Sequence, residues 1–242
     1  MTEIGSGVSQ FKIGDKVFGV VNFVGHGKAY AEYVAAPAEH LALKPDNIRH
    51  IEAAASTFSA LTAWQPFDSY GKLKPKDKVL IHGASVGVGH FAVQIAKHIG
   101  AYVIATSSSS NRDFVLGLGA DEHIDYPSVR FEKVLSDIDF VLEAVGGDNF
   151  QKSVQVLKPF GTILTLPSEH TKEDELKAQE KQLHACYFMS VYSSGSNMQY
   201  IATLLEKGIL KPYISHVFSF DETKAHLQID TGHSVGKVVV TL

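Results

Sequence analysis

The segment that most constrains the fold is residues 78–89, which read KVLIHGASVGVG. A short apolar run leads into a turn of small residues, and apolar side chains then recur at helical spacing as far as Ile99. A strand, a glycine-rich turn and a helix start in this order bind a dinucleotide pyrophosphate, because backbone N–H groups and the helix dipole face the phosphates. The residues predicted to contact the dinucleotide are Gly83, Ala84, Ser85, Val86, Gly87, Val88 and Gly89.

One residue of this turn departs from the usual G-x-G-x-x-G fingerprint. Aligned on Gly89, the sequence places Ala84 first and Val86 at the middle position, where glycine leaves room for the pyrophosphate. Glycine-rich strand–helix turns also occur for tight packing alone. The strand before the turn and the helix after it favour the binding interpretation.

From residue 78 onward, strand-like and helix-like segments alternate along the chain. Strands are predicted at 78–82, 102–106, 121–124, 138–143, 161–166 and 184–189, and helices at 87–99, 110–118, 148–157 and 195–207. This alternation predicts an α/β fold with a doubly wound parallel sheet covered on both faces. The charged stretch 170–181 is expected to be a solvated helix or loop.

The two ends of the chain have a different pattern. Residues 15–21 and 29–35 are rich in Val, Phe and Tyr and are separated by glycines, which predicts a pair of antiparallel strands. An alanine-rich helix is expected from Ile51 to about Tyr70, and β segments at 214–219 and 236–241. We expect a partial substrate domain at 1–70, a nucleotide-binding domain at 71–212 and C-terminal strands at 213–242 that return to the first domain.

Composition narrows the class of protein. The 242 residues are 45% hydrophobic and 20% charged, with a formal net charge of −4. Mild acidity offers no electrostatic footprint for nucleic acid or an anionic membrane, and no apolar run approaches the ~20 residues of a membrane span. The first residues lack the basic and apolar regions of a signal peptide. A single cysteine, Cys186, excludes an internal disulfide, and a cytoplasmic protein is expected.

The residues after the second predicted strand indicate which dinucleotide binds. NAD-binding proteins have a carboxylate about 20 residues after the glycines begin, for the ribose hydroxyls. Here that place holds Thr106 and Ser107–Ser110, and Asn111 and Arg112 follow. Short hydroxyl donors and a permanent cation suit a 2′-phosphate. The alternative is that the serines form a flexible loop that caps the next helix, with Arg112 on its surface. NADP(H) is therefore preferred over NAD(H).

In combination, several segments resemble a known family. VLIHGASVGVGHFAVQIAKHIGAYVIAT, LGADEHIDY, FKIGDKVFG and the closing GILKPYISHVFSFDETKAHLQIDTGHSVGKVVV are similar to the medium-chain dehydrogenase/reductase superfamily, and most similar to its zinc-free quinone oxidoreductase branch. The resemblance covers nearly the whole chain. It implies a Rossmann domain beside a GroES-like β-barrel that holds the substrate, with hydride transfer between nicotinamide and substrate.

The resemblance also implies roles for individual residues. It places Ser107 and Arg112 at the 2′-phosphate and Tyr126 beside the adenosine. Further residues are implied around the nicotinamide and its ribose, namely Thr62, Val145, Gly146, Leu166, Ser168 and Phe188.

Two features set this chain apart from the family pattern. Val86 replaces a residue that is usually glycine, and it is tolerated if its side chain points away from the phosphates. The chain also starts with Met1 close to an internal point of the family, so it is expected to be an N-terminally shortened member with an incomplete barrel. Open strand edges and apolar surface predict a homodimer that covers them.

The sequence provides little for metal or nucleophilic chemistry. A catalytic zinc site needs three protein ligands, and the histidines form no tight metal-binding pair, so no metal is expected. His26, Tyr30 and Thr62 are possible proton donors, but each has an equally plain structural role, and the catalytic residue stays unassigned.

The sequence therefore predicts a zinc-independent oxidoreductase that transfers a hydride from NADPH to a quinone or an α,β-unsaturated carbonyl as its small-molecule substrate. Two alternatives stay open. One is a non-catalytic NADP(H)-binding sensor or partner protein with an incomplete substrate domain. The other is an enoyl-thioester reductase.

Overall fold

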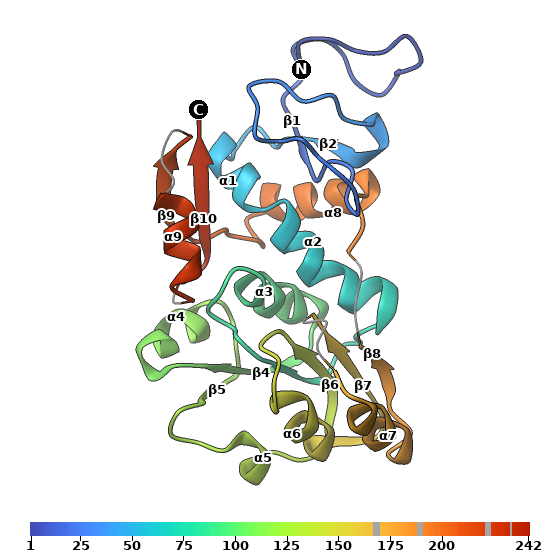
Figure 1. The fold of residues 1–242 in the computed structure, drawn as a ribbon, viewed down its shortest axis with the longest axis vertical. Coiled ribbons are helices and arrows are strands. Elements are labelled where there is room, and N and C mark those ends of the chain that lie inside the picture. The colour runs from blue at the N-terminus through green and yellow to red at the C-terminus, as the bar shows by residue number, and fades with distance from the viewer. Residues whose placement is uncertain (167–169, 188–190, 221–223, 233) are drawn as a thin grey trace. The chain divides into compact units, whose positions relative to one another are not determined.

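The computed structural model describes residues 1–166, 170–187, 191–220, 224–232 and 234–242 (Figure 1). The chain forms two compact units. Unit 1 consists of Met1–Thr62 and Ser190–Leu242, and unit 2 is Ala63–Met189. The sequence placed these boundaries after residues 70 and 212. Helix α8 (Gly195–Glu206) accounts for the later shift, because it contacts β2 (Leu41–Leu43) in unit 1.

Unit 2 is built around a parallel sheet of six strands in the order β5-β4-β3-β6-β7-β8. Its strands are β3 (Lys78–Ile81), β4 (Tyr102–Ser107), β5 (Glu122–Asp125), β6 (Ile138–Glu143), β7 (Leu157–Thr165) and β8 (His184–Cys186). The chain runs outward from β3 to β5 and then returns to β6 on the other side of β3. The predicted doubly wound sheet is confirmed, and the order of the strands reverses between β3 and β6, where ligands of such folds bind.

Helices cover both faces of this sheet (Figure 1). On one face lie α3 (Gly89–Ile99) and α4 (Arg112–Gly117), and on the other α5 (Phe131–Val134), α6 (Asn149–Val156) and α7 (Lys172–Glu180). Phe131, Phe150 and Ala178 of the second set pack against Leu80 and Val141 of the sheet in one buried cluster. The apolar residues that alternate with turn signals in the sequence thus form the core of unit 2.

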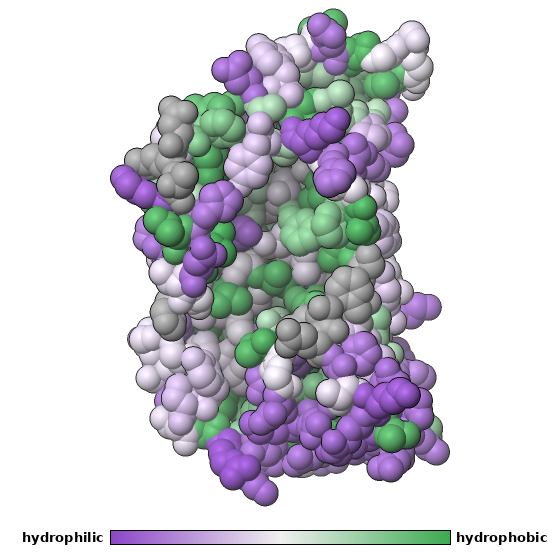
Figure 2. Space-filling view, viewed as in Figure 1, coloured by the Kyte–Doolittle hydropathy of each residue, from purple (hydrophilic) through white to green (hydrophobic). Residues whose placement is uncertain are grey.

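Helix α7 resolves the alternative left open for the charged stretch. Thr171 caps it, accepting from the backbone N–H of Asp174 at 3.2 Å, and the Asp174 carboxylate accepts from the backbone N–H of Thr171 at 2.8 Å. On the face shown in Figure 2, the surface over α6 and α7 is predominantly hydrophilic. The stretch is therefore a capped, solvated helix.

Unit 1 contains two separate strand pairs. β1 (Val17–Gly19) pairs with β2 in antiparallel fashion, and β9 (Ile214–Ser219) pairs with β10 (Lys237–Thr241) in parallel. Its other elements are α1 (His50–Ala55), the part of α2 (Phe58–Gln65) up to Thr62, α8, α9 (Lys224–Asp230) and the 3₁₀ turn η1 (Ala38–His40). Over the described residues these strands form no closed barrel.

Two predictions about the first seventy residues were wrong. Residues 29–35 are exposed throughout and form no strand, because the partner of β1 is β2 rather than this segment. The single helix expected from Ile51 to Tyr70 is divided at Ser56 and Thr57 into α1 and α2, and it ends in the π-helix η2 (Pro66–Tyr70). Pro66 has no N–H to donate, so the α-helical ladder ends there.

Candidate cofactor-binding site

The glycine turn between β3 and α3 has the close packing that its sequence predicts. Gly83 has φ of +63°, a conformation that glycine adopts without steric cost. A Cβ atom at Gly89 would overlap the carbonyl oxygen of Gly83 and lie 2.7 Å from the Cα of Ala84. Glycine at position 89 therefore lets α3 start directly against the end of the strand.

The start of α3 is suited to an anion. Its N-cap residue, Val88, makes no side-chain capping hydrogen bond, and the first turn contains no acidic residue. The N–H groups and positive dipole end of this helix are thus not opposed by a carboxylate of its own first turn. Ala84 donates its N–H to the carbonyl of Thr106 at 2.9 Å, which fixes the turn to the end of β4.

Val86, the unusual residue of the turn, packs within it. Its backbone N–H donates to the carbonyl of Gly83 at 3.2 Å, and its own carbonyl lies 3.1 Å from both the backbone nitrogen and Nδ1 of His90. The Cγ2 atom of Val86 and that of Val145 each lie 3.5 Å from the place a Cβ atom on Gly83 would occupy. The Val86 side chain thus lies on the same side of Gly83 as Val145.

His82, between β3 and the glycine turn, has a structural role. Its ring is fully buried between the hydroxyls of Thr106, 3.1 Å from Nδ1, and Ser153, 3.0 Å from Nε2. Burial lowers the pKa of His82 to about 4. The ring is therefore neutral at pH 7, and it joins β3, β4 and α6 at the base of the site.

The serine segment after β4 is attached to the glycine turn. Asn111 donates from Nδ2 to the Oγ of Ser85 and to that of Ser108, both at 3.2 Å. Ser108 and Ser110 are joined through their hydroxyls at 2.9 Å. The Arg112 side chain is 60% exposed, with an ion pair of 3.5 Å to Asp113, so its guanidinium is accessible to a ligand.

Ser107 and Tyr126 meet at the carboxyl ends of β4 and β5. The N–H of Tyr126 donates to the carbonyl of Ser107 at 3.3 Å, and the Tyr126 side chain is exposed. Asp125, which the sequence reading missed, accepts from the backbone N–H of Ser109 at 2.8 Å and from the Ser128 hydroxyl at 2.7 Å. The Asp125 carboxylate, on the neighbouring strand β5, thus holds the backbone of the serine segment at Ser109.

His123 is a second residue that the sequence reading missed. Its Nε2 lies 2.8 Å from the Oγ of Ser107, across the β4–β5 ladder. Burial, and then the positive charge of Arg112, hold the pKa of His123 below its usual value, while Asp125 acts in the opposite direction. The hydroxyl predicted to bind the 2′-phosphate therefore has an imidazole as its neighbour.

Glu143 organises the end of β6. Its buried carboxylate accepts the backbone N–H of Val145 at 2.8 Å and that of Gly146 at 3.0 Å. The N–H of Leu166 donates to the Glu143 carbonyl at 2.9 Å. Val145, Gly146 and Leu166, which the family resemblance grouped around the nicotinamide, are thus held together by one glutamate that the sequence reading missed.

The other predicted residues are less informative. Thr62 is buried in α2, where its hydroxyl donates to the carbonyl of Phe58 at 2.7 Å. Ser168 and Phe188 lie outside the described residues. The possible proton donor Tyr30 is exposed and lies 3.1 Å from Nε2 of His226 through its hydroxyl oxygen, while His26 is an exposed loop residue.

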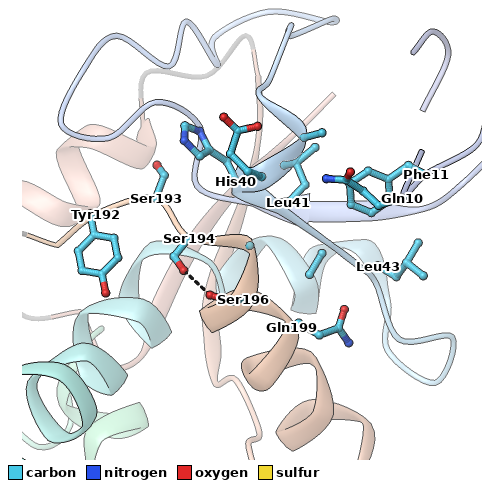
Figure 3. Close-up of a pocket in the computed structure, with 14 residues that line it drawn as sticks. Gln10, Phe11, His40, Leu41, Leu43, Tyr192, Ser193, Ser194, Ser196 and Gln199 are labelled. Carbon is cyan, nitrogen blue, oxygen red and sulfur yellow. Dashed lines mark hydrogen bonds between the residues drawn. The ribbon is translucent and has the colours of Figure 1, made fainter. Parts of the chain in front are cut away.

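A separate pocket of about 560 Å³ lies within unit 1 (Figure 3). The N-terminal end of α8 and the residues before it form one wall, and η1, β2 and the chain near Phe11 form the other. The ring of His40 is engaged there, since its Nδ1 accepts from the N–H of Asn22 at 3.2 Å. The hydroxyls of Ser194 and Ser196 lie 3.0 Å apart. Its lining thus combines hydroxyls and amides with the carboxylate of Glu39 and with the apolar side chains of Phe11, Leu41 and Leu43.

The described ranges contain neither a metal-ligand cluster nor a membrane-spanning helix. In those ranges, no three His, Cys, Asp or Glu side chains lie together as a metal site would require. No described helix is long and apolar enough to cross a membrane.

The donor set of unit 2 fits a dinucleotide that carries a 2′-phosphate. A helix start without an acidic cap lies beside a close-packed glycine turn. Asn111 links that turn to a hydroxyl-rich segment, and the accessible guanidinium of Arg112 follows it. Backbone N–H groups at a helix start, hydroxyls and a guanidinium are the groups that bind phosphates.

Known proteins resemble this chain in sequence and in fold. A family model described as zinc-binding dehydrogenase matches residues 118–240. The mitochondrial NAD(P)H oxidoreductase RTN4IP1 of Danio rerio is 32% identical over 99% of this chain and 69% of its own length. The 2-methylene-furan-3-one reductase of Solanum lycopersicum is 32% identical over 99% of this chain and 61% of its own length. The solved quinone oxidoreductase of Coxiella burnetii has a TM-score of 0.91 and 34% identity, over 99% of this chain and 76% of its own.

Proposed function

Because this chain belongs to the medium-chain dehydrogenase/reductase superfamily, in its quinone oxidoreductase-like branch, we propose that it transfers a hydride from NADPH to a quinone or an α,β-unsaturated carbonyl. Its relatives include an NAD(P)H oxidoreductase, a quinone oxidoreductase and an enone reductase. The chain is an oxidoreductase, and its cofactor is NADP(H).

The observation that carries the proposal is the connection between the glycine turn and the serine–arginine segment. The turn and the start of α3 would bind the pyrophosphate, and Ser107 and Arg112 would bind the 2′-phosphate. Asn111 holds the two parts together through Ser85. NAD(H) lacks the phosphate that this second part would bind, so the arrangement favours NADP(H).

The other end of the cofactor would lie at the carboxyl ends of β6 and β7. Glu143 holds the backbone of Val145 and Gly146, which we propose to flank the nicotinamide ribose. Leu166, Ser168 and Phe188 are proposed at the carboxamide, and Thr62 near the ring. When bound, NADPH supplies the hydride, so the task of these residues is to orient the ring.

Substrate binding is proposed for unit 1, in the manner of the family's GroES-like domain. Reduction of a quinone or an enone depends on orientation and on donors to the developing oxyanion more than on a dedicated acid–base pair. A reaction of this kind needs no bound metal, and a metal-independent reaction is proposed. Activity that survives dialysis against a strong zinc chelator would agree with it, and activity restored only by zinc would contradict it.

We also propose that the protein is cytoplasmic and forms a homodimer. The mild negative charge and ordinary composition support the first proposal. Exposed residues 28–35, which leave backbone and aromatic groups such as Tyr33 on the surface of unit 1, support the second. Light scattering that gives the mass of one chain would contradict the dimer, and fractionation of cells tests the location.

The experiment that tests the function is NADPH oxidation with a panel of quinones and enones, accompanied by a fluorescence titration of NADPH. Turnover above the enzyme-free rate, faster with NADPH than with NADH, is expected. Tight binding without turnover would favour the non-catalytic sensor, and turnover confined to enoyl thioesters would favour the thioester reductase. Absence of NADPH binding would contradict all three functions.

A further inference from the structure

Whether the Ser107 hydroxyl donates or accepts a hydrogen bond depends on its neighbours. Ser107 is buried, and its O–H is directed to the carbonyl of Ser108 at 3.1 Å. Nε2 of His123 lies 2.8 Å from the same oxygen. Since a hydroxyl has one hydrogen, Ser107 accepts from an Nε2–H of His123 in this arrangement.

A neutral imidazole also permits the opposite arrangement. If Nε2 carries no hydrogen, it accepts the Ser107 hydrogen, and the hydroxyl then presents lone pairs to its surroundings. An imidazolium can only donate, so it keeps the Ser107 hydrogen available for an anion. Protonation of His123 thus fixes Ser107 as a donor, whereas the neutral ring allows Ser107 to act as a donor or as an acceptor.

The charges around His123 change when an anion binds beside it. The charged groups whose fields reach the ring are Arg112, from α4, and Asp125, from its own strand. In the structure Arg112 disfavours the imidazolium. A phosphate dianion on Ser107 and Arg112 would neutralise that guanidinium and add negative charge nearby, and both effects favour a protonated ring.

We propose that His123 is a positioning residue for the 2′-phosphate of NADPH: its imidazole acts through the Ser107 hydroxyl and takes up a proton when the phosphate binds. This inference rests on the proposed function, because it assumes that NADPH occupies the site. It assigns to His123 a part in cofactor choice, since NADH brings no phosphate to Ser107. The preference for NADPH should therefore increase as the pH falls.

The direction of the pH dependence of NADPH affinity follows from the linkage between proton binding and NADPH binding. On this proposal NADPH binding raises the pKa of His123. NADPH affinity therefore starts to increase when the pH falls to the pKa of His123 in the complex, and it stops increasing below the pKa of His123 in the free protein. Each unit of increase corresponds to about tenfold in affinity. The phosphate itself titrates with a pKa of about 6, so measurements between about pH 6.5 and about pH 8.5 isolate the imidazole.

The test compares NADPH and NADH dissociation constants across that range in the wild type and in variants. His123→Gln keeps a side-chain donor but cannot titrate, and Ser107→Ala removes the hydroxyl through which His123 acts. His184→Gln is the matched control, because His184 is an exposed histidine on β8, the opposite edge strand of the same sheet. We expect the NADPH-to-NADH preference to rise severalfold toward low pH in the wild type and control, to rise less in Ser107→Ala, where the phosphate still acts on the ring by charge alone, and to stay flat in His123→Gln and in the double variant.

Calorimetry in buffers of different ionisation enthalpy gives a second readout. NADPH binding to the wild type should take up a fraction of a proton that is missing in His123→Gln. NADPH binding with the same pH dependence and proton uptake in His123→Gln as in the wild type would overturn the role of His123 and leave the proposed function standing. Failure of the wild type to bind NADPH at any pH would overturn both.

Discussion

Asn111 donates one hydrogen bond to Ser85 and another to Ser108, each at 3.2 Å, so a single amide connects the glycine turn to the serine segment. The two segments lie more than twenty positions apart in the sequence. Their connection means that the pyrophosphate end and the 2′-phosphate end of the proposed site are positioned together. Changes at either end should therefore be measurable as changes in the binding of one cofactor.

Arg112→Ala should weaken NADPH binding and leave NADH binding nearly unchanged. A charge-assisted contact to phosphate contributes about 1.5–3 kcal/mol, which corresponds to roughly 10- to 150-fold in the dissociation constant. Fluorescence titration of both cofactors measures the effect. Arg130→Ala is the control, because Arg130 pairs with Glu132 at 2.8 Å and not with a residue of the serine segment. Equal loss for NADPH and NADH would show that Arg112 does not bind the 2′-phosphate.

Gly89→Ala should disrupt the glycine turn. The new Cβ atom would overlap the Gly83 carbonyl, so backbone must shift, and we expect a loss of several kcal/mol in the free energy of unfolding together with lost NADPH binding. Gly117→Ala is the matched control, because a Cβ atom there meets nothing within 4 Å. In α4 that change should be neutral or should stabilise by up to about 1 kcal/mol. A Gly89→Ala protein as stable as the Gly117→Ala protein would contradict the packing described for the turn.

His82 should make stability depend on pH in mildly acid solution. Its pKa is about 4 in the fold, below the ordinary value of 6.5, so the unfolded chain binds the proton more readily. The contribution of His82 is therefore complete above about pH 6.5, and about 3 kcal/mol is lost as the pH falls toward 4.

Urea unfolding at several pH values measures this loss. His82→Gln cannot gain the proton, so its stability should fall less between neutral and acid pH than that of the wild type. His98→Gln, at an exposed position of α3, should follow the wild type. Parallel curves for the wild type and His82→Gln would show that His82 does not cause the acid sensitivity.

Glu143→Ala should destabilise unit 2 and weaken the binding of both cofactors. The change leaves the N–H groups of Val145 and Gly146 without their carboxylate acceptor, at a cost of about 3 kcal/mol in the free energy of unfolding. Glu143→Gln keeps one acceptor oxygen and should lose less. Glu122→Ala, at an exposed glutamate of β5, should change the free energy by less than about 1 kcal/mol. A Glu143→Ala protein indistinguishable from Glu122→Ala would contradict the role of Glu143.

The parallel sheet could be predicted from sequence because its signals are local. Each buried strand of unit 2 is a short apolar run that ends in glycine or polar residues, and helical periodicity follows. Residues 29–35 have the composition of a strand as well, but a strand also needs a pairing partner, and composition does not supply one. The end of α2 at Pro66 was missed because the alanine-rich pattern before it favours a longer helix, and no glycine or proline marks the break at Ser56 and Thr57.

The site was predicted as far as contiguous segments define it. The glycine turn and the serine–arginine segment can each be recognised from a contiguous stretch of the sequence. His123, Asp125 and Glu143 were missed because their parts depend on contacts across neighbouring strands or onto a following loop, such as the 2.8 Å between His123 and Ser107. Residue spacing in the sequence carries no information about such cross-strand pairs until the register of the sheet is known.

Transfer of deuterium tests the central claim most directly. The protein would be incubated with an enone and with NADPH deuterated at the transferring position of the nicotinamide ring, and the product would be analysed by mass spectrometry. The proposed function predicts one deuterium in the reduced product, and a faster reaction than with the equally labelled NADH. A product without deuterium, or no product from any quinone or enone while NADPH binds tightly, would contradict hydride transfer by this protein.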